Sequence, residues 1–343
     1  MIFDNNIIYD KVFVTGATGL VGSHIVCELL RKGKTVGIAY RSEQKLSILD
    51  AKLEKEGINS HYNSYKIDID SYEEFSEILH NYDAVIHAAA NVNLSKSTKK
   101  FVNYNLELTK AVLWAVEKAK IKRFVHISTI ATLGESHEDG QFIDETCEID
   151  SLVGKSAYSI GKFYCENAVF KYFYEGLNGV ILNPSVIIGC NAQKSSSSKI
   201  VATLAKKNKR YSSGVTGYVG VRDVARAATE ILDTNVTLKR LIVSNENLSY
   251  EELLTKSARV MGYEPPIKKV SDRLIKSAIS CLRFFEKLHI NFKYSSFLLE
   301  CLVAKKYYDG SSITKCSNFT YTSLDEQLEE SLSDFKVQFL EVP

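Results

Sequence analysis

Tyr158 and Lys162 stand four positions apart in the stretch 158–162. On a helix the phenol and the ammonium lie on one face, about one turn apart. An ammonium at that distance favours the phenolate, and each unit by which it lowers the phenol pKa corresponds to about 1.4 kcal/mol. Such a tyrosine can donate or accept a proton near neutral pH. The same spacing also occurs in surface pairs, so the prediction of a catalytic pair depends on the elements around it.

A glycine-rich turn follows the first apolar run. The run at 11–15 stops at glycine, and a helical pattern begins at Leu20. Gly16 permits a tight turn, Gly19 lets the backbone approach a pyrophosphate, and Gly22 lets the helix pack on the strand. The helix N-terminus then faces the anion. This turn predicts a dinucleotide site at Gly16, Thr18, Gly19, Leu20, Val21 and Gly22.

The second predicted strand, 35–40, ends in Arg41. An NAD-binding site usually places an acidic residue at this point, on the ribose 2′-hydroxyl, whereas a guanidinium suits a 2′-phosphate. The sequence therefore favours NADP over NAD, with Lys45 as a second contact. The alternative is that Arg41 stacks on adenine or is solvated.

Strand-like runs recur at 61–67, 84–90 and 123–128, and helical patterns cover 72–79 and 99–119. This alternation predicts an α/β fold with a doubly wound parallel sheet covered on both faces. Asp68 and Ile69 follow the third strand, where the sheet edge would meet adenine, although a helix cap is the alternative. The small residues Ala88, Ala89 and Ala90 leave room for the cofactor's ribose and diphosphate.

Ser128 and Thr129 follow the fifth strand. Ligands of an open parallel sheet sit beyond the carboxyl ends of its strands, so both hydroxyls are expected at the crevice. A hydroxyl beside Tyr158 would orient a carbonyl oxygen for acid catalysis. Asn105, inside the long predicted helix, is expected to hold a water or a backbone carbonyl beneath the site.

These motifs, together with the stretch 183–189, resemble the extended short-chain dehydrogenase/reductase superfamily, also called the NAD-dependent epimerase/dehydratase family. The resemblance covers nearly the whole chain. It implies that Thr129 occupies the position of the family's catalytic serine or threonine and that Tyr158 is the general acid/base. It also implies that Lys162 binds the nicotinamide ribose, that Asn105 is the helix asparagine, and that Pro184 and Ser185 line the nicotinamide. A homodimer through the helices that start near 99 and 156 is a further implication.

Three departures narrow the activity that the resemblance implies. Asn183 stands where many sugar-nucleotide members have arginine, and Cys190 where they often have proline. Ile130 and Ala131 replace the Asp-Glu pair of the dehydratases, which disfavours water elimination. With Arg41, the pattern is similar to the branch that includes dihydroflavonol reductase. The leading hypothesis is therefore an NADPH-dependent reductase of aldehydes or ketones. The alternatives are a nucleotide-sugar epimerase with tightly held NAD and a dinucleotide-sensing regulator.

The second half of the chain is expected to complete the sheet and to bind substrate. We predict a nucleotide-binding domain over 1–190, completed by about 218–245, and a mainly helical substrate portion over 191–217 and 246–343. Further helices are expected at 199–209, 250–261, 274–288, 297–308 and 323–335. The basic residues of 199–210 suit a solvated face or an anionic substrate. The segment 274–308 is either a membrane-surface helix or a hydrophobic lid with domain core.

Composition excludes several classes of protein. The formal net charge is +2, from 43 basic and 41 acidic residues, so no global field would recruit nucleic acid or an anionic membrane, and any such partner would need a local patch. Seven scattered cysteines argue against a disulfide framework or a zinc site and favour a reducing, cytoplasmic setting. No run is apolar enough for a membrane span, and no signal peptide is recognised.

Overall fold

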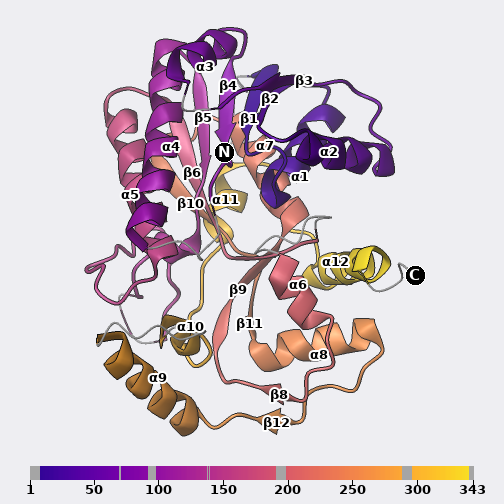
Figure 1. The fold of residues 1–343 in the computed structure, drawn as a ribbon, viewed down its shortest axis with the longest axis vertical. Helices are drawn as coiled ribbons and strands as arrows, with labels where there is room; N and C mark the ends of the chain where they lie inside the picture. Colours follow the sequence, from indigo (N-terminus) through magenta and orange to yellow (C-terminus); the bar gives the residue numbers. More distant parts are fainter. Residues whose placement is uncertain are drawn as a thin grey trace.

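The computed structural model describes residues 8–68, 71–91, 98–136, 138, 140–190, 198–287 and 296–339. A parallel seven-stranded sheet forms the upper part of the molecule in Figure 1, and a smaller lobe lies below the carboxyl ends of its strands. The strand order is β10-β6-β5-β4-β1-β2-β3. The strands are β1 (Lys11–Thr15), β2 (Thr35–Tyr40), β3 (Asn63–Lys66), β4 (Ala84–His87), β5 (Arg123–Ile127), β6 (Gly179–Pro184) and β10 (Lys239–Val243).

Helices cover both faces of this sheet, which confirms the predicted doubly wound fold. One face carries α1 (Leu20–Arg31), α2 (Glu43–Lys55), α7 (Val221–Leu232) and α11 (Ser311–Cys316). The other carries α3 (Tyr72–Leu79), α4 (Thr98–Lys118) and α5 (Ala157–Tyr174).

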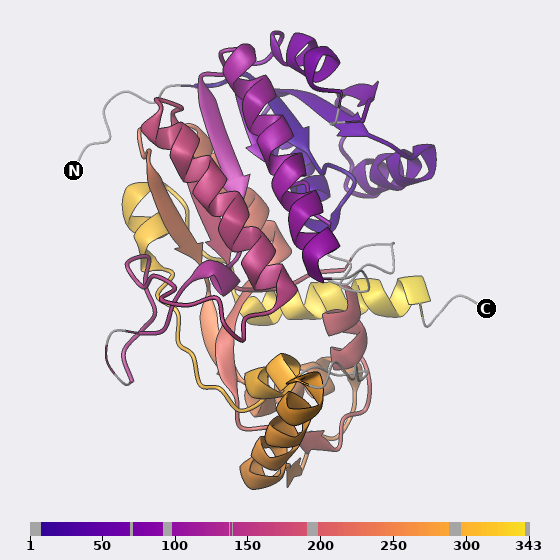
Figure 2. The same cartoon turned by 60° about the vertical axis from the view of Figure 1, so that its left-hand side comes forward.

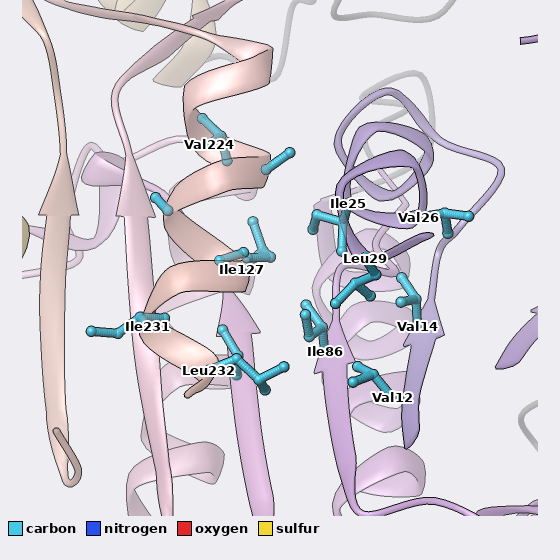
Figure 3. Packing of buried hydrophobic residues seen from close by; sticks show 14 of the residues in the cluster. Val12, Val14, Ile25, Val26, Leu29, Ile86, Ile127, Val224, Ile231 and Leu232 are labelled. Atoms are coloured by element: carbon cyan, nitrogen blue, oxygen red, sulfur yellow. The ribbon is translucent and has the colours of Figure 1, made fainter. Parts of the chain in front are cut away.

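The alternation of side chains along each strand explains this layering. Val12 and Val14 join the core under α1 and α7, whereas Phe13 between them points into the opposite core. Figure 3 shows the first core, where Val12 and Val14 lie close to Leu29 of α1. Each fully buried aliphatic side chain contributes about 1.5–3 kcal/mol to folding.

The smaller lobe has a three-stranded sheet of order β11-β9-β7. Its strands are β7 (Val186–Ile188), β9 (Val215–Gly220) and β11 (Glu246–Ser249), and they pack with α6 (Ser198–Leu204), α8 (Tyr250–Met261) and α12 (Leu324–Phe339). A two-stranded ribbon of β8 (Arg210–Tyr211) and β12 (Lys268–Lys269) lies at the lower end, with α9 (Asp272–Lys287) and α10 (Ser296–Cys301) beside it. No helix in the described ranges is long and apolar enough to cross a membrane.

Two predicted helices are wrong in extent, and two helices, α2 and α11, were not predicted. The helix expected over 199–209 ends at Leu204 and gives way to β8. The helix expected over 297–308 ends at Cys301, because Lys305 and Tyr308 form β-bridges with Val215 and Ile143. Helix α2 escaped prediction because only Leu49 and Leu53 of its side chains are fully buried.

Asp223 joins the two parts of the structure. It is fully buried in the first turn of α7 and forms an ion pair with Arg226, at 2.9 Å. Its carboxylate also accepts hydrogen bonds from the Thr322 amide, at 2.9 Å, and from Gln327 Nε2, at 2.8 Å. The carboxylate therefore fixes the segment that leads into α12 to the start of α7.

Arg123 is a fully buried cation at the start of β5. Its guanidinium donates to the carbonyls of Ile231, at 2.8 Å, and Leu232, at 3.2 Å, and to Asn178 Oδ1, at 2.8 Å. These carbonyls end α7, where a helix dipole favours positive charge. Burial lowers the pKa of Arg123 to about 10.

We expect Arg123→Met to lower the free energy of unfolding by about 3 kcal/mol, because buried acceptors lose their donor. Lys122→Met is the matched control, since its ion pair with Asp83 is exposed and such pairs contribute less than about 1 kcal/mol. Urea unfolding followed by circular dichroism measures both. Equal midpoints for the two variants would contradict the capping role of Arg123.

Candidate active site

A pocket opens at the carboxyl ends of β1, β2, β3 and β4. It gathers nine of the residues predicted for the dinucleotide: Gly16, Thr18, Gly19, Arg41, Lys45, Asp68, Ala88, Ala89 and Ala90. Tyr40, Ser42, Asn91, Tyr104 and Leu108 complete most of its wall. Leu20, Val21 and Gly22 belong to α1 behind the turn and do not line the pocket with their side chains. Ile69 lies outside the described residues.

The glycine turn has the geometry that phosphate binding requires. Gly16 has φ +72°, and a Cβ there would lie 2.6 Å from the Ala89 amide nitrogen. A Cβ on Gly22 would lie 2.1 Å from the Gly16 carbonyl oxygen, so α1 packs on the turn only with glycine. No side chain caps the start of α1, and its first turn contains no acidic residue. The turn therefore fits an anionic diphosphate.

Arg41 follows β2 at the pocket wall, as predicted, and no carboxylate occupies that position. Its Nη1 donates to the Tyr104 hydroxyl of α4, at 2.8 Å. The phenol thus holds the guanidinium across the pocket, with Lys45 in the same wall. The arrangement presents two positive charges at the pocket wall that follows β2.

The Asn105 side chain hydrogen-bonds to backbone groups beneath the site. A backbone carbonyl was one of the two partners expected for it, the other being a water. Its Oδ1 accepts from the Asn91 amide, at 2.7 Å, and its Nδ2 donates to the carbonyls of Asn91 and Phe101, at 3.1 and 3.2 Å. The buried carboxamide therefore fixes the chain as it leaves the alanine segment 88–90. Its position supports the pocket wall.

A hydrogen bond joins the two elements that carry Thr129 and Tyr158. Thr129 caps the 3-10 helix η1 (Ile130–Thr132), and Tyr158 lies in the first turn of α5. Ser159 Oγ donates to the Ala131 carbonyl in η1, and the Ser159 amide donates to the cap residue Ser156, at 3.1 Å. The contact brings the Tyr158 hydroxyl within hydrogen-bonding reach of the Thr129 side chain.

The prediction that Lys162 lowers the pKa of Tyr158 is wrong for this arrangement. Burial raises the pKa of Tyr158 above its usual range, and the hydrogen bond with Thr129 offsets only part of that rise. Lys162 instead donates to the Ile127 carbonyl at the end of β5, at 2.9 Å. Burial lowers the pKa of Lys162, while Cys165 and Glu166 raise it. Tyr158 therefore stays a neutral phenol, the form that donates a proton.

Asn183 and Glu166 form a buried network behind Thr129 that the sequence did not reveal. Asn183 Nδ2 donates to the Thr129 carbonyl at 3.0 Å, and it lies 2.6 Å from Glu166 Oε1. The same carboxylate oxygen accepts from the Thr132 hydroxyl, at 2.7 Å. The network joins β6, η1 and α5. The only sequence signal for it was Asn183 at a position where other members have arginine.

Three further predicted residues, Ser128, Pro184 and Ser185, lie at the carboxyl ends of β5 and β6. Pro184 is the last residue of β6, and the Ser185 amide donates to the Val243 carbonyl, at 3.0 Å. The Ser128 and Ser185 hydroxyls are buried, and neither has a hydrogen-bond partner among the described residues. Two such hydroxyls fit a site completed by a polar ligand. Within the same ranges no cluster of three metal-binding side chains occurs.

Comparisons with known proteins agree with this geometry. Residues 12–243 match the NAD dependent epimerase/dehydratase family. Cinnamoyl-CoA reductase 1 of Petunia hybrida is 27% identical over 270 residues, which cover 76% of this chain and 80% of that protein. A putative dihydroflavonol 4-reductase of Synechocystis is 28% identical over 266 residues, covering 75% and 74%. The fold is similar to that of a nucleoside-diphosphate-sugar epimerase from Pseudomonas aeruginosa, with a TM-score of 0.77, 19% identity, and coverage of 96% and 98%.

We expect Asn183→Leu to lower the free energy of unfolding by about 2 to 3 kcal/mol, because the Thr129 carbonyl and the Glu166 carboxylate each lose a donor in a buried site. Asn81→Leu is the control: Asn81 also donates to one carbonyl, at 3.2 Å, but it is exposed. Its substitution should cost less than about 0.5 kcal/mol. Equal losses in chemical denaturation would argue against the network.

Proposed function

The chain belongs to the NAD-dependent epimerase/dehydratase family of NAD(P)-dependent enzymes, and we propose that within it this chain reduces an aldehyde or ketone carbonyl with NADPH. The observation that carries the proposal is the Tyr158 phenol, neutral and within reach of the Thr129 hydroxyl, at the end of the strand next to the dinucleotide pocket. The curated relatives named as reductases support the same choice.

In the proposed reaction NADPH supplies a hydride to the carbonyl carbon. The Thr129 hydroxyl, with Ser128 nearby, binds the carbonyl oxygen, and Tyr158 gives its proton to that oxygen as negative charge develops there. The products are an alcohol and NADP⁺. When the cofactor is bound, Lys162 would hold the nicotinamide ribose, and Pro184 and Ser185 would line the nicotinamide. The glycine turn would hold the diphosphate, and Ala88, Ala89 and Ala90 would leave it space.

A neutral Tyr158 suits the acid step of a reductase. An epimerase begins by removing a hydroxyl proton and so needs a base at the start of its cycle, whereas a reductase needs an acid. Burial raises the pKa of Tyr158, which keeps the acid form. Asn183 supports the same choice, because it stands where many sugar-nucleotide members have arginine and its Nδ2 is taken up by the Thr129 carbonyl and Glu166.

We expect Tyr158→Phe to lower kcat by about 10² to 10⁴, because the alkoxide loses its proton donor. The dissociation constant of NADPH should stay unchanged. NADPH oxidation is measured with a panel of aromatic and aliphatic aldehydes and ketones, together with cinnamoyl-CoA. Tyr164→Phe, a more exposed tyrosine of the same helix, is the control and should keep full activity.

Normal turnover in Tyr158→Phe would remove Tyr158 from the mechanism. Native mass spectrometry of the purified wild type tests the alternative activity. NAD retained through purification, with no net nicotinamide consumption on any carbonyl, would indicate an epimerase and contradict the reductase.

We expect Arg41→Ala to weaken NADPH binding by about tenfold to a hundredfold, because the 2′-phosphate loses one charge-assisted hydrogen bond. NADH has no 2′-phosphate, so its binding should stay unchanged. Tyr104→Phe should weaken NADPH binding less, because it removes only the hydrogen bond that places the guanidinium. Fluorescence titration with both cofactors measures each constant. An unchanged preference in Arg41→Ala would show that Arg41 does not read the 2′-phosphate.

A further inference from the structure

The lower end of the small lobe concentrates positive charge that the whole-chain composition conceals. Segments that are about 60 residues apart in the sequence meet there, because β8 pairs with β12 and α9 begins three residues later. We call this surface the basic end. Its eight exposed basic residues are Lys206, Lys207, Lys209, Arg210, Lys268, Lys269, Arg273 and Lys276.

No basic side chain of this surface forms an ion pair with a described residue, in contrast to many basic residues elsewhere. Arg31 pairs with Glu28 and Glu56, Lys34 with Asp233, and Lys55 with Asp334. The segments 206–213 and 264–276 contain only two acidic residues, Glu264 and Asp272. Asp272 accepts a hydrogen bond from Ser213 Oγ, at 2.6 Å. Glu251 of α8, which hydrogen-bonds to Tyr211 of β8, is a third carboxylate beside this surface, so eight basic residues face three acidic ones in a chain of formal charge +2.

The pairing of the strands places like charges side by side. Lys268 stands directly opposite Arg210, and the Lys268 amide donates to the Lys209 carbonyl, at 3.2 Å. Like charges opposite one another on neighbouring strands destabilise a sheet. An external anion would relieve this repulsion, which indicates a surface that binds a polyanion.

Exposed aliphatic side chains accompany these charges. Ile267, next to β12, is 89% exposed, and Leu274, in the first turn of α9, is 68% exposed. Single-stranded nucleic acids are usually bound by aromatic side chains on which bases stack. Lysine-rich surfaces that expose aliphatic residues instead suit a bilayer interface, where the chains insert among lipids and the ammonium groups meet anionic headgroups.

We propose that the basic end binds the surface of a membrane that contains anionic phospholipids. In Figure 1, β8, β12 and the start of α9 lie at the end of the molecule farthest from the top of the large sheet. Docking there leaves the dinucleotide pocket, at the carboxyl ends of β1 to β4, in water. The proposal concerns a surface outside the candidate active site and does not depend on the proposed reaction.

The test is co-sedimentation of the full chain with vesicles of phosphatidylcholine mixed with phosphatidylglycerol, compared with phosphatidylcholine alone. We expect binding only to the anionic vesicles, and release at about 1 M salt, where the Debye length is about 3 Å. The variant Arg210→Gln/Lys268→Gln/Lys269→Gln should bind about a hundredfold more weakly, since each basic residue near such a surface contributes about fivefold. Ile267→Ser tests insertion and should weaken the binding that remains at moderate salt.

The matched control is Lys11→Gln/Lys118→Gln/Lys239→Gln. It removes the same charge from exposed lysines at the opposite end of the molecule, and it should bind the vesicles as the wild type does. Three results would each overturn the proposal: no binding to anionic vesicles at low salt, an equal loss in both triple variants, or tighter binding of the basic end to an oligonucleotide than to the vesicles. All substituted side chains are exposed, and unchanged circular dichroism verifies their folding.

Discussion

The candidate active site depends on one buried carboxamide. Asn183 at the end of β6 donates to the Thr129 carbonyl and contacts Glu166 of α5, so one side chain links the three elements around the proposed catalytic groups. Ser159 adds a second link, from α5 to the Ala131 carbonyl. Hydroxyl groups must be placed to within a fraction of an ångström to share a proton. Residues that touch neither substrate nor cofactor therefore set the distance between Thr129 and Tyr158.

The sequence predicted what depends on local pattern. The glycine turn, Arg41 and the strand ends at Ser128 and Ala88 follow from the order of strands and helices, and the structure places each where that order requires. Contacts between distant segments were not predictable. The bond from Lys162 to the Ile127 carbonyl spans 35 residues, and it changes the expected effect of the lysine on Tyr158. A spacing of four residues predicts that two side chains are close on a helix. It does not predict which acceptor a flexible lysine ammonium will bind.

The errors in the small lobe have the same origin. Basic residues after Leu204 fit a helical pattern, yet the chain there forms β8 because β12 provides a partner strand. Helix α10 ends early because the following segment forms bridges to Val215 and Ile143. Short strands owe their existence to pairing rather than to intrinsic preference. Each of these elements therefore becomes visible only when residues far along the chain are in place.

The two ends of the molecule differ in how their positive charges are matched. Around the sheet, cations such as Arg123 and Lys34 are matched by acceptors that the fold itself supplies, and these interactions stabilise the fold. Arg41 lines the dinucleotide pocket, and at the basic end positive groups face the solvent and form no ion pair with a described residue. Such unmatched charge costs stability in the free protein and is retained where an external anion supplies the compensation. A net charge near zero is therefore compatible with two distinct surfaces for anions, the proposed nucleotide pocket and the proposed lipid-binding basic end.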